Sequence, residues 1–270
     1  MDDLFFLEKY AYRESLIHRL DARVKILVTL AAIIAMVAVP YTTEARLVAG
    51  IFLFFCGGLW LLAGLPPLAY FTRLAMVLPF GMFIIIFQIF FKNPYYESYH
   101  VLVALPAGIS IYAESVEFST ILLAKFMVCI SFVLLLSSTT RMQDLLGGAG
   151  RLGLPREFTL CIGMMIRYLF VFARMIRRTR NALQTRCFDP FDRTLSYRYR
   201  LRQLCLSIGT IFLRSYEQGE RTYISMLCRG YTGDSHLYIG KKPLGRADIG
   251  FAACSLLIII TVPLAIVLSG

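Results

Sequence analysis

The sequence lacks the motifs that mark nucleotide, zinc and nucleic-acid chemistry. No G-x-x-x-x-G-K-[ST] phosphate loop is present, which excludes ATP binding through a P-loop. The seven cysteines form no C-x-x-C pair, and the three histidines, His18, His100 and His236, are widely separated. This dispersal argues against a metal site built by this chain. We therefore expect no metal and no cofactor, and no motif indicates a nucleic-acid partner.

Charged residues are absent from several long stretches of the chain. A helix needs about 20 consecutive apolar residues to cross a bilayer, and 58% of this sequence is apolar. The five candidate spans are residues 26–40, 47–65, 74–91, 118–138 and 249–269. The first is short, but Lys25 can snorkel at its end. The composition therefore predicts an all-α membrane protein with about five transmembrane helices.

Positive charge is concentrated between the fourth and fifth candidate spans. Residues 141–246 hold 19 Lys and Arg against 7 Asp and Glu, whereas the rest of the chain holds 9 against 10. The loop 92–117 carries one Lys and three Glu. Because basic loops stay on the cytoplasmic side, we expect a multi-pass protein of the cell inner (plasma) membrane. The N-terminus and residues 139–244 are then cytoplasmic, and loop 92–117 is external.

The first ten residues, MDDLFFLEKY, are acidic, and no small-residue cleavage site follows them. They do not resemble a signal peptide, so we expect the chain to be inserted into the membrane rather than exported.

The predicted organisation has three parts. Residues 1–138 form an N-terminal segment and four transmembrane helices, residues 139–244 a cytoplasmic helical region, and residues 245–270 a final transmembrane helix. The cytoplasmic region is basic, which favours anionic lipid headgroups together with a protein partner over nucleic acid.

Three helices are predicted in the cytoplasmic region. Thr140-x-x-Gln143 has the spacing of a capping box, and the short helix after it is expected to break at Gly147-Gly148. A second helix covers 156–187 and ends before Asp189-Pro190. A third covers 198–229, where apolar residues recur every three or four positions and predict one buried face. The members of that stripe are Leu201, Leu204, Cys205, Ile208, Ile211, Phe212, Ser215, Gly219, Thr222, Tyr223 and Met226. Gly209 and Gly219 lie on or near this face, where they either permit a close helix crossing or are tolerated weak points.

Both long helices end in a lone arginine. The two ends read Thr185-Arg186-Cys187 and Cys228-Arg229-Gly230. A cation suits a helix C-terminus, and Gly230 suits the position just after one, so the two arginines can be helix caps. Alternatively, an arginine on a helix end with small neighbours can enter a groove and pair with a carboxylate there.

The sequence resembles the T component of energy-coupling-factor (ECF) transporters, in its CbiQ-type cobalt or nickel branch. The resemblance covers nearly the whole chain and rests on SLIHRLDARVKIL (15–27), LLGGAGRLGLPREF (145–158) and RSYEQGERTYISMLCRGYTG (214–233). It implies two long cytoplasmic coupling helices that cross, each ending in an Ala-Arg-Gly-like motif that docks in a groove of one ATPase subunit. Here Thr185 and Cys228 replace the alanine, and Cys187 replaces the first glycine.

The resemblance also implies the partners and the function. The chain would bind two ATP-binding cassette ATPase subunits and a substrate-binding integral membrane subunit within the lipid bilayer. It would transmit motion without catalysing a reaction itself. The expected substrate is cobalt or nickel.

Two other functions remain open. One is a T component that serves a vitamin-binding subunit. The other is a membrane enzyme such as a lipid-headgroup transferase, which needs clustered acidic metal ligands at the membrane face. Asp189 and Asp192 form only a lone acidic pair. Lys125, the single charge in the fourth span, either has a functional role, or pairs with a neighbouring helix or snorkels outward.

Overall fold

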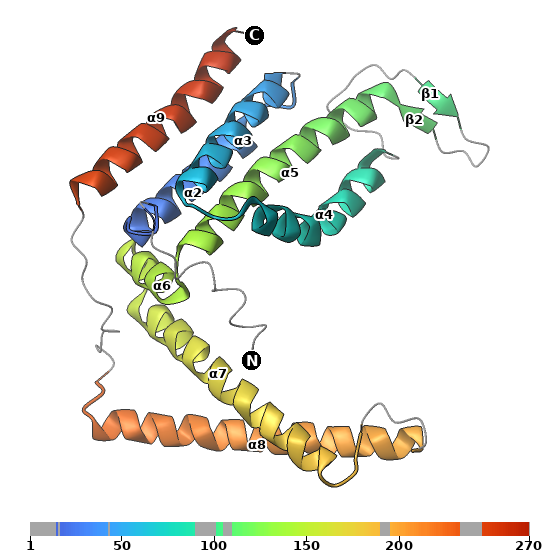
Figure 1. Cartoon of the computed structure of the whole chain (residues 1–270), viewed down its shortest axis with the longest axis vertical. Helices are drawn as coiled ribbons and strands as arrows, with labels where there is room; N and C mark the ends of the chain where they lie inside the picture. The colour runs from blue at the N-terminus through green and yellow to red at the C-terminus, as the bar shows by residue number, and fades with distance from the viewer. Residues whose placement is uncertain are drawn as a thin grey trace. The chain divides into compact units, whose positions relative to one another are not determined.

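The computed structural model describes residues 15, 17–42, 44–89, 101–104, 110–189, 195–232 and 245–269. These residues are almost entirely helical, which confirms the predicted all-α class. The helices are α2 (Ala22–Ala38), α3 (Glu44–Leu62), α4 (Pro67–Ile89), α5 (Ala113–Thr139), α6 (Met142–Arg151), α7 (Arg156–Gln184), α8 (Tyr197–Cys228) and α9 (Arg246–Ser269). One feature was not predicted, a short antiparallel hairpin of β1 (Val101–Ala104) and β2 (Ser110–Tyr112) that precedes α5 (Figure 1).

The chain divides into two compact units. One unit contains residues 2–148 and 240–270, and we call it the membrane unit. The other contains residues 149–239 and holds α7 and α8, and we call it the helical-arm unit. The boundary between them falls inside α6.

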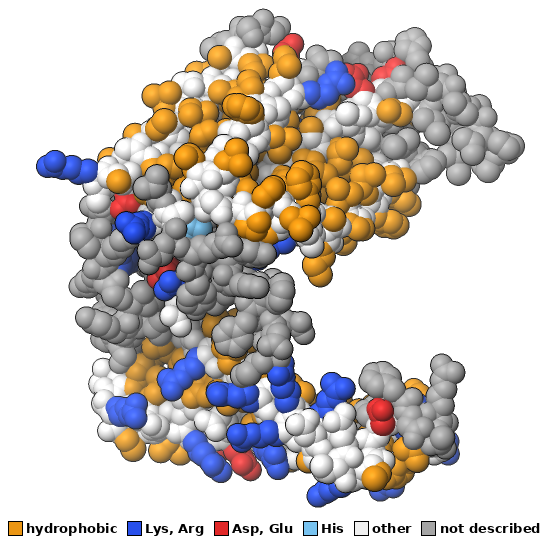
Figure 2. All heavy atoms as spheres, in the orientation of Figure 1, with side chains coloured by type: hydrophobic (Ala, Val, Ile, Leu, Met, Phe, Trp, Pro, Cys, Tyr) orange, Lys and Arg blue, Asp and Glu red, His pale blue; other side chains and the backbone are white. Residues whose placement is uncertain are grey.

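The membrane unit is built around α5, which packs against α2, α3 and α4, while α9 packs against α2 and α3. Its core residues with almost no exposed surface include Ala32, Met36, Val48, Phe52, Ile121, Val128, Phe132 and Ile259. The outer surface is also apolar, since Phe54 and Met76 each keep 86% of their surface exposed. Figure 2 shows hydrophobic side chains in orange over this unit. An apolar exterior of this extent suits a bilayer rather than water.

Five helices among the described residues are long and apolar enough to cross a membrane. They are α3, α4, α5, α9 and, in addition, α7 over Glu157–Gln184. The number matches the prediction, but one member differs. The predicted span 26–40 corresponds to α2, which has only 17 residues and is partly enclosed by its neighbours. The length and hydropathy that make α7 a potential span were not predicted.

The region around α6 corrects two predictions. Thr140 ends α5, and its buried hydroxyl has no hydrogen-bond partner among the described residues, so the capping box with Gln143 does not form. Gly147 and Gly148 do not break the helix either, because α6 continues to Arg151. A Cβ atom on Gly148 would lie 3.2 Å from the Cβ of Ala22. Gly148 therefore allows α6 to approach the first turn of α2 closely.

Candidate docking site at the ends of two long helices

Helices α7 and α8 form the helical-arm unit and contact each other through a small number of residues. The Tyr168 hydroxyl and the Thr222 hydroxyl are 2.6 Å apart, and the rings of Phe188 and Tyr199 meet edge to face with centroids 6.1 Å apart. Figure 1 shows α7 passing across α8. The predicted helices 156–187 and 198–229 are confirmed to within three residues at each end.

The contact between these helices is narrower than the sequence indicated. None of the described side chains of α8 is buried, so the prediction of one buried face is wrong. Ile211, Thr222 and Met226 are half-buried, whereas Ile208 and Phe212 are exposed. A single neighbouring helix covers only a strip of the surface, which leaves the rest of the apolar stripe uncovered. Gly209 and Gly219 have no atom within 4 Å of an added Cβ, so neither marks a close crossing within this chain.

The C-terminus of α7 closes in a Schellman motif. The backbone N–H of Phe188 donates to the carbonyl of Leu183, and that of Cys187 donates to Gln184, each at 3.0 Å. Cys187 has a φ of 55°, the left-handed conformation that glycine usually provides at this position. Arg186 is the residue directly before this left-handed turn, and Thr185 lies in the last helical turn before it.

The C-terminus of α8 closes in the same way. The backbone N–H of Tyr231 donates to Met226, and that of Gly230 donates to Leu227, each at 3.0 Å. Gly230 has a φ of 80°. Arg229 therefore occupies the position in α8 that Arg186 occupies in α7, and Cys228 lies directly before it.

The two ends are thus one structural motif used twice. The order is an arginine, a left-handed residue and an aromatic residue, which is Phe188 in α7 and Tyr231 in α8. Cys187 stands where α8 has Gly230, yet both residues adopt the left-handed backbone conformation. Sequence reasoning did not single out Phe188 and Tyr231, although an aromatic after each Arg-Cys or Arg-Gly pair was visible as a repeated signal.

Neither arginine side chain is needed to cap its helix. The Schellman hydrogen bonds already satisfy two carbonyls of the last helical turn at each end through backbone N–H groups. Arg186 and Arg229 are exposed, and within the part of the chain that the structure describes neither guanidinium has an ion-pair partner. Since Phe188 contacts Tyr199 at the start of α8, the two arginines lie near opposite ends of this helix, about 45 Å apart at 1.5 Å per residue.

Lys125, the charge in the fourth predicted span, contacts the end of a neighbouring helix. Its ammonium donates to the carbonyls of Val37 and Val39, where α2 ends, and lies 4.0 Å above the ring of Tyr41. The reverse contact exists at the other end of α2. There Lys25 donates to the carbonyl of Thr139, the last residue of α5, at 2.9 Å. Each lysine thus satisfies carbonyl groups at the C-terminus of the other helix, and we call this pair the lysine clasp.

A second polar contact ties the start of α9 to the start of α2. One carboxylate oxygen of Asp248 accepts the backbone N–H of Asp21 at 3.0 Å, and the other accepts that of Gly245 at 2.8 Å. Asp21 in turn accepts from the backbone N–H of Arg23 and so caps α2. Both carboxylates therefore lie at helix N-termini, whose partial positive charge they complement.

The described residues offer no metal site. No group of three His, Cys, Asp or Glu side chains among them could hold an ion. His100 and His236 lie outside the described residues, and His18 is hydrogen-bonded to Ser15 at 2.7 Å.

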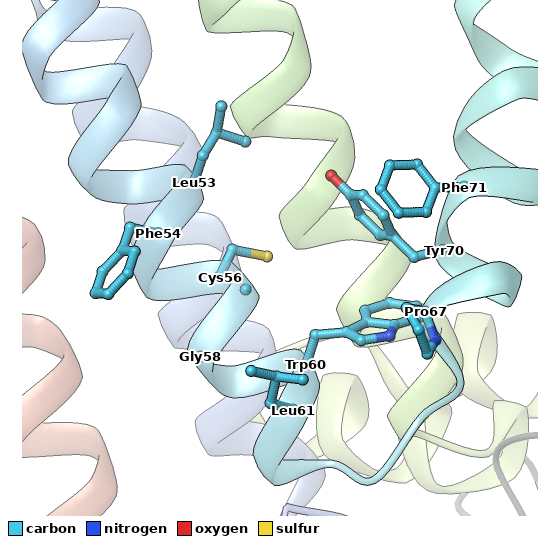
Figure 3. Close-up of a pocket in the computed structure, with 10 residues that line it drawn as sticks. Leu53, Phe54, Cys56, Gly58, Trp60, Leu61, Pro67, Tyr70 and Phe71 are labelled. Carbon is cyan, nitrogen blue, oxygen red and sulfur yellow. The ribbon is translucent and has the colours of Figure 1, made fainter.

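A cavity of about 660 Å³ opens between α3 and α4. Figure 3 shows Phe54, Leu61 and Tyr70 among its apolar and aromatic lining. The Tyr70 hydroxyl is hydrogen-bonded to Ser131 at 2.7 Å, and Cys56 supplies the only thiol of the lining. This lining lacks the ligands that a transition metal ion requires.

Comparison with known proteins identifies relatives over most of the chain. The family model "CbiQ: Cobalt transport protein" matches residues 13–239, which include both arginine ends. An uncharacterized protein of Methanocaldococcus jannaschii is 24% identical over 260 residues, which are 96% of this chain and 85% of that protein. A second uncharacterized protein of the same organism is 24% identical over 184 residues, 67% of this chain and 66% of that protein. With its apolar helices and this match over most of its length, the chain is a multi-pass membrane protein that belongs to the CbiQ cobalt transport protein family.

Proposed function

We propose that this chain is the T subunit of an ECF-type importer. In this role it scaffolds the complex and transmits ATPase motion to a substrate-binding integral membrane subunit. Arg186 and Arg229 each dock one ATP-binding cassette ATPase subunit, with Thr185, Cys187, Cys228 and Gly230 forming their small surroundings. The chain itself catalyses no reaction, because ATP hydrolysis belongs to the partner subunits.

The observation that carries this proposal is the geometric equivalence of the two helix ends. Arg186 and Arg229 occupy the same position of the same capping motif, and both are exposed. Two equal, well-separated contacts suit two copies of one partner. An arginine projecting from a rigid helix end can pair bidentately with a carboxylate in a groove.

The proposal assigns a side of the membrane to each part. The N-terminus and residues 139–244 face the cytoplasm, where ATP is available, and residues 92–117 face outward. The support for this orientation is the excess of 12 positive charges within residues 141–246, from 19 Lys and Arg against 7 Asp and Glu. In this arrangement residues 1–138 and 245–270 anchor the helical coupling region in the bilayer.

The proposed substrate is the cobalt ion that the family description names. This chain does not ligate it, and a partner membrane subunit does. The wide separation of His18, His100 and His236 in the sequence supports this division of labour.

Affinity purification of the tagged chain from membranes of its native host tests the proposal. We expect two ATPase subunits per chain and one further integral membrane protein, with cobalt bound to the latter. Recovery of the chain without any ATPase, from membranes that take up cobalt through it, would contradict the proposed role.

A further inference from the structure

The first half of α8 carries arginines and apolar side chains on one outward face. We define this α8 outer face by Arg198, Leu201, Arg202, Cys205, Ile208 and Phe212, each of which lies three or four residues from another member. All six are exposed, and Ile208 and Phe212 keep 65% and 70% of their surface accessible. α7 does not cover this face, because its contacts are made by the neighbouring strip that includes Thr222.

The charge on this part of α8 is of one sign. Residues 197–216 of α8 contain four arginines and no acidic residue. The whole helical-arm unit, residues 149–239, contains 15 arginines and no lysine, against six acidic residues. Figure 2 shows these basic side chains in blue over the unit. Arginine binds phosphate through two parallel hydrogen bonds, which lysine cannot provide.

The order of residues along the axis separates charge from apolar surface. Arg198 and Arg202 lie in the first turns, and Ile208 and Phe212 follow on the same side, about 10–15 Å further along the helix. Tyr197 and Tyr199 flank the arginines, and aromatic residues of this kind favour the membrane–water boundary. A helix of this design lies at a bilayer surface, with its apolar side chains about 5–10 Å deep and its cations among the headgroups.

We propose that the α8 outer face binds the anionic phospholipid headgroups of the bilayer in which the membrane unit is embedded. Charge complementarity favours this occupant. The face presents Arg198 and Arg202 within a helical stretch that has no acidic residue, which matches a surface of uniform negative charge, whereas protein surfaces usually interleave both signs. The proposal does not depend on ATPase docking at Arg186 and Arg229, which lie outside this face.

A spin label on Cys205 tests the proposal in the full-length chain. The other exposed cysteines are replaced by serine, and the protein is reconstituted in vesicles of phosphatidylcholine alone or with phosphatidylglycerol added. Collision with oxygen reports a lipid environment, and collision with a water-soluble nickel chelate reports an aqueous one. We expect the label to be lipid-exposed only in vesicles that contain phosphatidylglycerol. Near 1 M salt, where the Debye length is about 3 Å, the label should return to water.

Two double variants that remove the same amount of charge distinguish an effect of this face from an effect of the unit's net charge. With Arg198→Gln and Arg202→Gln combined, the ratio of lipid-docked to free label should fall roughly thirtyfold. Arg214→Gln and Arg221→Gln remove the same charge from the opposite side of α8, and this pair should change the ratio less than threefold. Both variants must keep wild-type helicity by circular dichroism.

Three results would overturn the proposal. In the first, the label stays aqueous in phosphatidylglycerol vesicles. In the second, both variant pairs have equal effects. In the third, the label becomes protected only when ATPases or another membrane protein are co-reconstituted, which would make the α8 outer face a protein interface.

Discussion

Replacing Lys125 with methionine tests whether the lysine clasp holds α2 and α5 together. Methionine keeps much of the side-chain volume and removes the ammonium that donates to the carbonyls of Val37 and Val39. It also removes the contact with the ring of Tyr41. If the role of Lys125 is structural, its loss lowers stability before it affects any transport step.

The expected magnitude follows from these contacts. Hydrogen bonds from a charged donor contribute about 1.5–3 kcal/mol, and a desolvated cation–π contact contributes about 2 kcal/mol. Burying the ammonium opposes these gains. We therefore expect Lys125→Met to lower the free energy of unfolding by about 2–4 kcal/mol. At roughly 2–4 °C per kcal/mol, the melting temperature falls by about 4–16 °C.

The assay is a thermal melt of the purified chain in detergent, monitored by circular dichroism. Lys25→Met, which removes the contact with Thr139 at the other end of α2, should cause a loss of similar size. Arg46→Met serves as a control, because the Arg46–Glu117 ion pair is partly exposed and its loss costs about 1 kcal/mol or less. If Lys125→Met melts like the wild type but stops transport, the clasp reasoning is wrong and Lys125 acts in transport.

Three further predictions address packing, backbone conformation and topology. Gly148→Ala should destabilise the chain by about 1–3 kcal/mol, since its Cβ would approach α2 to 3.2 Å, whereas Gly209→Ala meets open space and should be neutral or stabilising in the same melt. Cys187→Gly should raise stability by about 1 kcal/mol by removing a left-handed non-glycine residue, and it should leave ATPase binding unchanged in a pull-down. In right-side-out vesicles of an otherwise cysteine-free chain, an impermeant thiol reagent should label a cysteine at Ser98 and not one at Ser225; the reverse pattern would refute the proposed orientation.

The long helices could be predicted because each depends on a local pattern. Runs of about 20 residues with at most one charge predicted α3, α4, α5 and α9, and the amphipathic repeat predicted α8. Several of the failures are contacts between segments distant in sequence. Gly148 was expected to break α6, yet it provides close approach to Ala22, which only the folded chain brings near.

At the candidate site, too, some features could be predicted from local sequence patterns and others could not. The positions of Arg186 and Arg229 at two helix ends were predicted from helix breakers and from the family resemblance. The left-handed Cys187 was not, because a non-glycine residue rarely adopts that conformation and sequence propensity argues against it. The exposure of Phe212 was also missed, since periodicity reports an apolar face without showing whether a neighbour covers it.

The most direct test of the account combines Arg186→Ala with Arg229→Ala. A helix-end charge contributes about 0.3–1 kcal/mol, whereas truncating an arginine held by a carboxylate in a desolvated groove costs about 2–5 kcal/mol. Each single variant should therefore weaken ATPase association more than tenfold. Lysine at either position should rescue only partly, because its ammonium lacks the planar fork.

The measurement is the number of ATPase subunits that copurify with each variant, alongside a melt of the isolated chain. We expect the double variant to keep the wild-type melting temperature to within a few degrees, to release both ATPases and to lose cobalt uptake. A double variant that retains two ATPases and normal uptake would contradict the docking role and leave the arginines as helix-end residues only.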